Sequence, residues 1–367
     1  MCAGVNQSAK NSGDVEAIVT DLWDRVLERG RAAHEASILD LKVGMLRVYR
    51  LLSEIGKATG VVIPITAMFK ADTLAEMIDL VRSGKAPKGQ ALAELKEGEG
   101  TPLFIFPGIS GVALELAQLA RLIDYPGPIY GNQPRGLDGD APPHTTVVEM
   151  AQHQVAAIRT EQPRGPYRIA GYSCGGLVAI ETARLLLNEG ETVEFLGLME
   201  PSLPEWQWPF AARVEFFWRR CKHHANTIRG LSATEIKEYL VSHAGPVLGR
   251  ARRMLGARHV GTSPYHREGL PPGLAETRAA GWAALQAHRL DSYPGKAILF
   301  CSERGNPLGC NVAIAYPAFL QAHDVCPFGG DHAGMLREPH VHELAAHISN
   351  RLAQIDLYVS SQCCTKH

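Results

Sequence analysis

The stretch GYSCGG, residues 171–176, places a serine among small residues where two sequence patterns meet. A short apolar run, residues 167–170, precedes it, and a helical pattern, residues 177–187, follows it. A strand that turns sharply into a helix strains the backbone of the serine, and side chains at the flanking glycines would collide. Such a turn raises the serine Oγ above the sheet edge, where the helix N-terminus favours negative charge. The pattern therefore predicts that Ser173 is a nucleophile.

A serine hydroxyl needs a base that takes its proton, and the base needs a carboxylate that orients it. In α/β-hydrolases these residues follow one another along the chain in the order serine, acid, histidine. His332 satisfies this order, because it lies in the glycine-rich loop GGDHAGML after the last predicted strand. His340, His342 and His347 lie on or near the predicted final helix, and we interpret them as solvated.

Two glutamates are candidates for the orienting acid. Glu200 directly follows the predicted strand 195–199, and Glu303 follows the predicted strand 297–301. The carboxyl ends of parallel strands are where the sites of α/β proteins are built, so either residue is suitably placed. Asp331 stands next to the predicted base, and we interpret it as a residue that shapes the loop.

An oxyanion hole requires two backbone N–H groups directed at the tetrahedral oxygen. We expect one from Cys174, directly after the nucleophile, and the other from the loop FPGISG, residues 106–111. The Cys174 thiol itself is expected to be a small packed side chain rather than a reactive group.

Beyond Thr101, short apolar runs alternate with helical patterns. This alternation predicts an α/β fold with a mostly parallel sheet and helices on both faces. A helical insertion without a clear strand interrupts it at residues 201–290. Strands are expected at 103–106, 129–131, 167–170, 195–199, 297–301 and 322–326, and helices at 112–123, 147–161 and 176–189.

The rest of the chain divides by composition. Residues 1–13 are expected to form a disordered leader, and residues 14–82 carry apolar residues at helical spacing, which predicts a small all-α bundle. Residues 83–100 are rich in Gly, Lys and Glu and are expected to be a linker. The α/β domain is expected at residues 101–355, and residues 356–367 are expected to be a tail.

Composition excludes several classes of protein. A net charge of −1 argues against a globally basic nucleic-acid binder, and no apolar run is long enough to span a membrane. The N-terminus lacks the apolar core of a signal peptide. The eight cysteines include no CxxC pair, which indicates reduced thiols and a cytoplasmic location. Neither cysteines nor histidines show metal-ligand spacing, so no metal site is expected.

Residues 101–350 resemble the type I thioesterase domains of nonribosomal peptide and polyketide synthases. The resemblance is carried by PLFIFPGISG, the long stretch from IYGNQPRG to GGLVAIETARLL, LGLMEPSLP, YPGKAILFCSER and GGDHAGMLREPHVHELAAHI. It implies an α/β-hydrolase fold with a helical lid at the insertion. It also implies a thioesterase of secondary-metabolite biosynthesis, which releases an acyl or peptidyl chain by hydrolysis, cyclisation or transfer.

The resemblance also assigns the site residues. It implies a triad of Ser173, His332 and Glu200, where the family usually has Asp in place of Glu. Because Glu is one methylene longer, Glu303 stays open as the alternative acid. The oxyanion N–H groups fall on Ile109 and Cys174.

Residues 14–82 resemble an acyl or peptidyl carrier domain over the stretch from LDLKVGMLRVYRLL to TLAEMIDLV. A working carrier holds its phosphopantetheine arm on a serine, and the resemblance places Met45 at that position. Met has no hydroxyl, so the phosphodiester cannot form. The resemblance thus implies a carrier fold without an attached cofactor. It implies that the substrate arrives on the phosphopantetheine of a partner carrier protein or synthase module.

Three alternatives stay open. The chain is either an acyl-transferring serine hydrolase, a catalytically weak module that binds acyl chains or partners, or a carboxylester or amide hydrolase with the same triad. Residues 210–268 hold 11 Lys and Arg against 4 Glu. This basic segment is either a docking face for an acidic partner or a solvated helical surface.

Overall fold

The chain is described here from a computed structural model. It covers residues 12–28, 30, 34–38, 43, 45–69, 71–84, 90–139, 141–232, 234–239, 241, 270, 272–307 and 309–364. The expected leader lies outside these residues, except for Ser12 and Gly13, which open the first helix.

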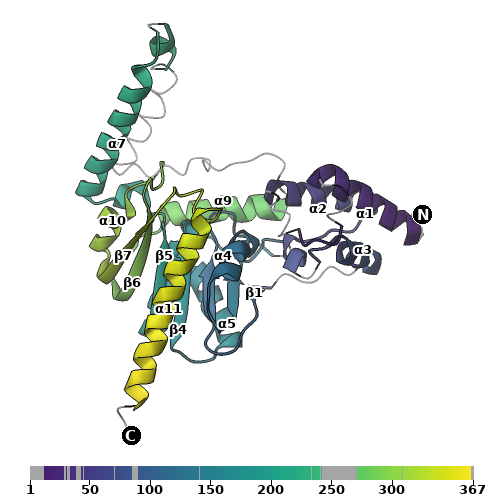
Figure 1. Cartoon of the computed structure of the whole chain (residues 1–367), viewed down its shortest axis with the longest axis horizontal. Coiled ribbons are helices and arrows are strands. Elements are labelled where there is room, and N and C mark those ends of the chain that lie inside the picture. Colours follow the sequence, from purple (N-terminus) through teal and green to yellow (C-terminus); the bar gives the residue numbers. More distant parts are fainter. Residues whose placement is uncertain are drawn as a thin grey trace, which may run out of the picture.

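A seven-stranded sheet forms the centre of the α/β part (Figure 1). Its order is β1-β3-β2-β4-β5-β6-β7, and every neighbouring pair is parallel except β1 and β3. The strands are β1 (Leu92–Lys96), β2 (Leu103–Phe106), β3 (Ile129–Asn132), β4 (Tyr167–Tyr172), β5 (Val193–Met199), β6 (Tyr293–Ser302) and β7 (Leu320–Phe328). The predicted α/β class with a mostly parallel sheet is confirmed.

The strand β1 corrects the expected linker at residues 83–100. Ala93 pairs antiparallel with Gly131 of β3, and Leu95 packs against the buried core. LAELK carries charged residues among its leucines, which is typical of an edge strand. The stretch forms a strand because β3 offers it a partner, and a linker composition does not reveal such tertiary pairing.

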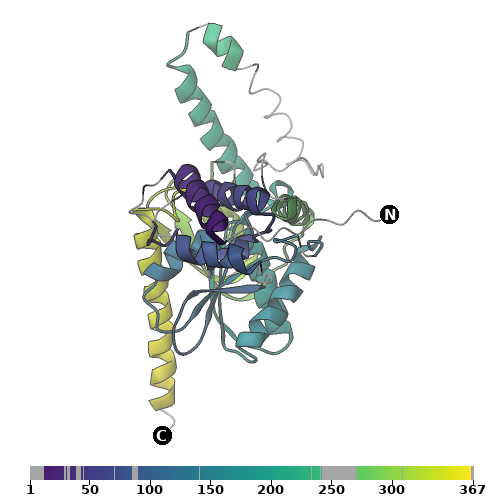
Figure 2. The same ribbon diagram turned by 90° about the vertical axis from the view of Figure 1, so that its right-hand side faces the viewer.

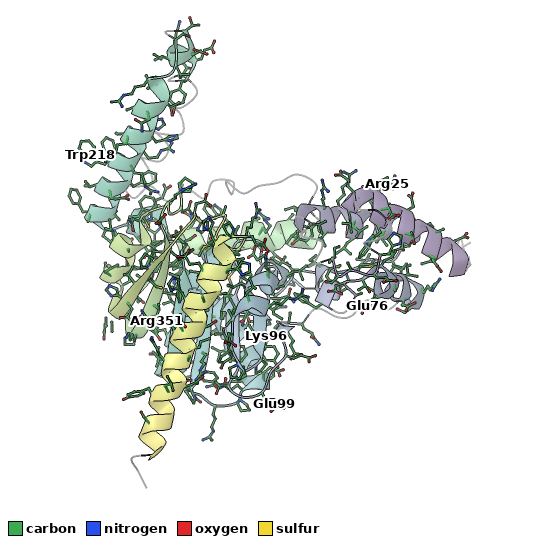
Figure 3. All side chains as sticks on the ribbon, viewed as in Figure 1. Arg25, Glu76, Lys96, Glu99, Trp218 and Arg351 are labelled. Atoms are coloured by element: carbon green, nitrogen blue, oxygen red, sulfur yellow. The ribbon has the colours of Figure 1, made fainter. Side chains whose placement is uncertain are left out.

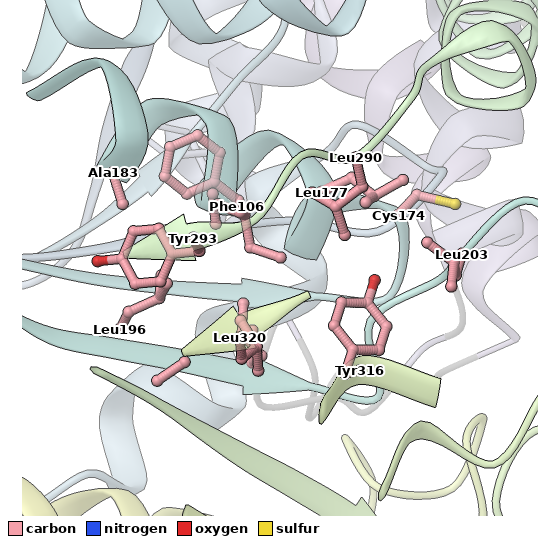
Figure 4. Packing of buried hydrophobic residues seen from close by; sticks show 14 of the residues in the cluster. Phe106, Cys174, Leu177, Ala183, Leu196, Leu203, Leu290, Tyr293, Tyr316 and Leu320 are labelled. Atoms are coloured by element: carbon pink, nitrogen blue, oxygen red, sulfur yellow. The ribbon is translucent and has the colours of Figure 1, made fainter. Parts of the chain in front are cut away.

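Both faces of the sheet are buried. In β2, Phe104 and Phe106 join the cluster under α5 and α6, whereas Leu103 and Ile105 join the cluster under α4 and α11. Figure 4 shows the first cluster. The helices are α4 (Ala117–Leu122), α5 (Val147–Glu161), α6 (Cys174–Asn188) and α11 (His340–Cys364), with the short turns η3 (Ala113–Leu116), α10 (Val312–Ala315) and η5 (Tyr316–Ala318). Burial on both sides explains why β2 and the second half of β5 are continuous apolar runs.

The final helix α11 corrects the expected tail at residues 356–367, because the helix continues to Cys364. Asp356 on this extension accepts a hydrogen bond from Arg168 of β4, a side chain that is only 5% exposed. This charge pair ties the extended helix to the sheet.

The described part of the insertion after β5 is helical, as expected. It contains η4 (Glu205–Gln207), α7 (Phe210–Ile228) and α9 (Pro272–Ala287). The helix α7 projects away from the sheet (Figures 1 and 2), and Trp218 on it is 61% exposed (Figure 3). Residues 242–269 lie outside the described part, and with them five of the eleven basic residues of the segment 210–268.

The N-terminal helices pack against the α/β part. They are α1 (Ser12–Leu27), α2 (Met45–Thr59), η2 (Ile65–Phe69) and α3 (Leu74–Ser83), and we call them the helical unit. Trp23, Leu51 and Met77 are fully buried at its centre. The same cluster continues into Leu114 and Leu274 of the α/β part, so one apolar core joins the two parts. Figure 2 shows the helical unit on the side that faces the viewer, and Leu274 near the start of α9 belongs to its apolar cluster.

Candidate active site

Ser173 stands at the turn between β4 and α6, with φ 52° and ψ −121°. Its N–H donates to the Met199 carbonyl at 2.9 Å, which fixes the turn against β5. Glycine is required around it. A Cβ on Gly175 would lie 2.2 Å from the Pro107 carbonyl oxygen, and one on Gly171 would lie 2.7 Å from the Gly175 carbonyl oxygen. The turn has the strand–serine–helix form that the sequence predicts.

His332 reaches Ser173 from the loop after β7. Its Nε2 lies 3.0 Å from the Ser173 Oγ, within hydrogen-bond distance. The Tyr172 hydroxyl donates to the His332 carbonyl at 2.8 Å, and the two rings stack with centroids 5.3 Å apart. The predicted base and nucleophile are therefore brought together. Tyr172, which precedes the nucleophile in the chain, thus holds the base in place. The sequence analysis did not predict this role.

Glu200 lies behind His332, and its side chain is 3% exposed. One carboxylate oxygen, Oε1, accepts hydrogen bonds from the backbone N–H of Ser302 at 2.8 Å and from its hydroxyl at 3.0 Å. The other oxygen, Oε2, lies 3.8 Å from the His332 Nδ1. Within the described part of the chain, neither of these two atoms has a hydrogen-bond partner, and they lie on the two sides of this gap.

Glu303 lies elsewhere. Its side chain is exposed, and its backbone N–H donates to the Phe328 carbonyl at 2.9 Å. The geometry thus brings Glu200, and not Glu303, to the imidazole. Asp331 accepts the Gly334 N–H at 2.7 Å, which is the loop-shaping contact expected for it.

Ser202 is a further neighbour of the nucleophile that the sequence analysis missed. Its Oγ lies 3.3 Å from the Ser173 Oγ and 3.8 Å from the Cys174 Sγ. The only sequence signal is that it follows Glu200 by two residues. Burial raises the pKa of the Cys174 thiol to about 11, so this sulfur stays protonated at neutral pH. Figure 4 shows Cys174 among the apolar side chains of the core.

The loop after β2 is where the second oxyanion donor, Ile109, is expected. Among the described residues, no acceptor pairs with the backbone N–H of Ile109 or of Cys174. Glu115 fixes this loop, because its carboxylate accepts the Gly108 N–H at 2.5 Å. Desolvation raises the pKa of the Glu115 carboxyl, and its hydrogen bonds and the nearby Arg278 oppose the rise. Nothing in the sequence distinguishes Glu115 from a surface glutamate.

Beside Ile109 and Cys174 lies an open pocket, whose empty volume of about 590 Å³ includes part of the surrounding solvent. Ile109 and Cys174 line it, together with the end of β3 and with residues of α5, α6 and α9. Its wall is largely apolar, as Met150, Val178 and Leu285 show. An apolar pocket that opens beside a nucleophile and two free N–H groups is suited to hold the acyl part of a substrate.

The parallel sheet, the strained serine between β4 and α6, the histidine after β7 and the acid after β5 define an α/β-hydrolase. Residues 101–213 match the family model described as "Thioesterase domain". The chain therefore contains a type I thioesterase domain of the kind found in nonribosomal peptide synthetases, as the sequence resemblance implies.

Curated relatives are large synthases. The chain is 31% identical over 192 residues to the indigoidine synthase of Dickeya dadantii, a match that covers 52% of this chain and 13% of that protein. It is 33% identical over 187 residues to a dimodular nonribosomal peptide synthase of Bacillus subtilis, covering 50% of this chain and 8% of that protein. The chain thus spans only a small share of the length of these relatives.

A solved four-domain nonribosomal peptide synthetase, bound to AMP and glycine, has a similar fold. The match has a TM-score of 0.54 and 19% identity, and it covers 95% of this chain and 27% of that one. In the described part, no helix of this chain is both long and apolar enough to cross a membrane.

Proposed function

We propose that this chain is a thioesterase that releases an acyl or peptidyl chain through an acyl-enzyme on Ser173. The observation that carries the proposal is the 3.0 Å contact between the Ser173 Oγ and the His332 Nε2. Ser173 stands at a sharp turn, where its backbone has a strained positive φ. The membership of the surrounding domain in the thioesterase family supports thioesters as the substrates.

The geometry supports a two-step acyl transfer. The Ser173 Oγ attacks the thioester carbonyl while its proton passes to the His332 Nε2, and Glu200 stabilises the imidazolium from the Nδ1 side. The tetrahedral oxygen accepts hydrogen bonds from the Ile109 and Cys174 N–H groups. By analogy with oxyanion holes of other enzymes, each donor stabilises the transition state by about 3–4 kcal/mol. The C–S bond then breaks, and His332 returns the proton to the leaving thiol. Water, an amine or a hydroxyl attacks the acyl-enzyme next, with His332 again as the base.

The donor of the acyl group is proposed to be a partner carrier. Met45 is the first residue of α2, where the resemblance to carriers places the serine that holds phosphopantetheine. A thioether side chain cannot form the phosphodiester, so we infer that the acyl chain arrives in trans on the phosphopantetheine of another carrier protein or synthase module. Cys174, Cys301 and Cys310 are unpaired thiols, which supports a reducing, cytoplasmic setting.

One observation favours a second candidate, a catalytically weak acyl-binding module. The 3.8 Å between Glu200 Oε2 and His332 Nδ1 is longer than a hydrogen bond, and Ser302 holds the other oxygen of the same carboxylate. Catalytic hydrogen bonds are often long in structures without substrate and shorten in the reacting complex, so we favour the enzyme.

Intact-protein mass spectrometry tests the proposal. Wild type and Ser173→Ala are mixed with acyl thioesters, both free and carrier-bound, and with the matching oxygen esters. We expect a transient acyl adduct on wild type alone, formed faster from thioesters than from esters. The decay products then distinguish hydrolysis, cyclisation and transfer. The absence of an adduct from every donor, together with no labelling of Ser173 by a serine-directed phosphonate, would favour the acyl-binding module.

A further inference from the structure

A chain of amide groups crosses the floor of the pocket. The Asn132 Nδ2 donates to the Gln154 Oε1 at 2.8 Å, and the Gln154 Nε2 donates to the Gln133 backbone carbonyl at 2.7 Å. Asn132 ends β3, Gln154 lies on α5, and both line the pocket. We call this arrangement the amide relay.

The relay determines which atom of Asn132 is left free. A backbone carbonyl is only an acceptor, so the Gln154 NH₂ must face it, and the Gln154 oxygen must therefore face Asn132. That oxygen in turn requires the Asn132 NH₂, which leaves the Asn132 Oδ1 at the end of the relay. The orientation of both amides thus follows from one backbone group.

The Asn132 Oδ1 is buried and has no hydrogen-bond partner in the described part of the chain. The residue is 1% exposed, although it lines an open pocket. A buried acceptor without a partner is unfavourable in free energy, because it has lost its hydrogen bonds to water and gained none in return. A group that enters the pocket and donates a hydrogen bond would recover this free energy.

Two other residues that line the pocket also carry buried polar atoms. They are Thr277 on α9 and His144 before α5, whose Oγ1 and Nδ1 have no hydrogen-bond partner among the described residues. Thr277 is 6% exposed, and its hydroxyl can either donate or accept. The apolar wall therefore carries a small set of polar atoms, as in pockets that orient a ligand through a few hydrogen bonds.

We propose that Asn132 is a specificity residue, whose Oδ1 accepts a hydrogen bond from an N–H or O–H group carried by the acyl chain. The pocket thus selects a chain with a donor along its length over a plain alkyl chain of the same size. This inference rests on the proposed function, because it takes the pocket beside Ile109 and Cys174 as the acyl site. A site built to pair with a donor discriminates strongly against an analogue that lacks it.

Calorimetric binding to the full-length Ser173→Ala protein tests this inference without turnover. The ligands are N-acetylcysteamine thioesters of a medium-length acyl chain. One series carries a secondary amide at successive positions, a matched series replaces each N–H by an ester oxygen, and one ligand is all-carbon. We expect the amide to bind about tenfold more tightly than its ester counterpart at one position of the chain. The comparison needs no substitution in the pocket.

A substitution then assigns the effect to Asn132. In the Ser173→Ala background, Asn132→Leu should reduce the amide-to-ester ratio to about one and strengthen binding of the alkyl chain. Asn132→Leu combined with Gln154→Met should have the same effect. This double variant is used if the single variant folds poorly, because it removes both partners of the 2.8 Å bond. Met150→Leu changes an apolar part of the wall and should keep the preference.

Equal binding of amides and esters at every position would overturn the inference, because water would then satisfy the Asn132 Oδ1. A preference that survives Asn132→Leu would overturn it as well. Neither result affects the acyl adduct on Ser173, whose absence is the separate sign that the proposed function is wrong.

Discussion

Tyr172 holds His332 in two ways at once. Its hydroxyl donates to the His332 carbonyl at 2.8 Å, and its ring stacks on the imidazole at an interplanar angle of 22°. Because Tyr172 precedes Ser173 directly, the segment that positions the nucleophile also positions the base. The 3.0 Å contact between Oγ and Nε2 thus depends on a local connection as well as on the loop after β7, since β5 and β6 separate β4 from β7 in the sheet.

Tyr172→Phe removes the hydrogen bond and keeps the stacked ring. We expect kcat to fall by about threefold to tenfold with little change in KM, because one neutral hydrogen bond is worth about 1 kcal/mol. Tyr172→Ala removes both the hydrogen bond and the stacked ring, and it should lower kcat clearly further than Tyr172→Phe. Steady-state kinetics with a soluble thioester gives the two parameters. An equal loss in both variants would show that the ring contributes nothing to the position of His332.

Glu200→Gln should lower kcat by about 10³–10⁴-fold, because an amide cannot stabilise the imidazolium. Glu303→Gln is the matched control, since this side chain is exposed, and it should leave kcat unchanged. Single-turnover acylation of both variants measures the step in which His332 takes the proton. A larger loss in Glu303→Gln than in Glu200→Gln would reverse the assignment of the acid.

The fold of the α/β part follows closely from the sequence. Its central strands are buried on both faces, so apolar runs such as residues 103–106 predict them, whereas the edge strands β1 and β7 carry exposed residues. The chain order of Ser173 and His332 leads to the contact that the structure shows. These features can be predicted from the sequence because each depends on a local pattern or on a rule of chain order.

Other features depend on contacts that no local pattern reveals. β1 is a strand because β3 pairs with it, and Glu200 differs from Glu303 only in its burial against the imidazole. Asn132 and Thr277 reach one pocket from elements that are far apart in the chain. Such roles arise from tertiary packing, which overrides the local preferences of the sequence.

The apolar core that joins the helical unit to the α/β part leads to a prediction about stability. Leu274 on α9 is 1% exposed and belongs to the cluster that includes Trp23 and Leu51. Leu274→Ala should lower the free energy of unfolding by about 2–5 kcal/mol and expose the helical unit to limited proteolysis. Urea denaturation measures the first effect.

Leu352→Ala is the matched control for this prediction. Leu352 on α11 is also 1% exposed, but it belongs to the cluster under α4 and α11, which contains no described residue of the helical unit. The Leu352→Ala variant should lose a similar amount of its free energy of unfolding, but its helical unit should stay resistant to protease. The same proteolysis pattern in both variants would argue that Leu274 does not fasten the helical unit.

The pocket histidines predict how stability depends on pH. Desolvation lowers the pKa of both His144 and His153 below 6.5, and Arg135 acts in the same direction. As the pH falls below about 7, the unfolded chain therefore takes up protons before the folded one, and the free energy of unfolding decreases. Replacing both residues with Gln should flatten this decrease between about pH 7 and 5, measured by urea denaturation.

His288, whose pKa burial also lowers, should leave part of the decrease in place in the double variant. His342→Gln, at an exposed position on α11, is the control and should keep the full decrease. An unchanged slope in the double variant would contradict the prediction.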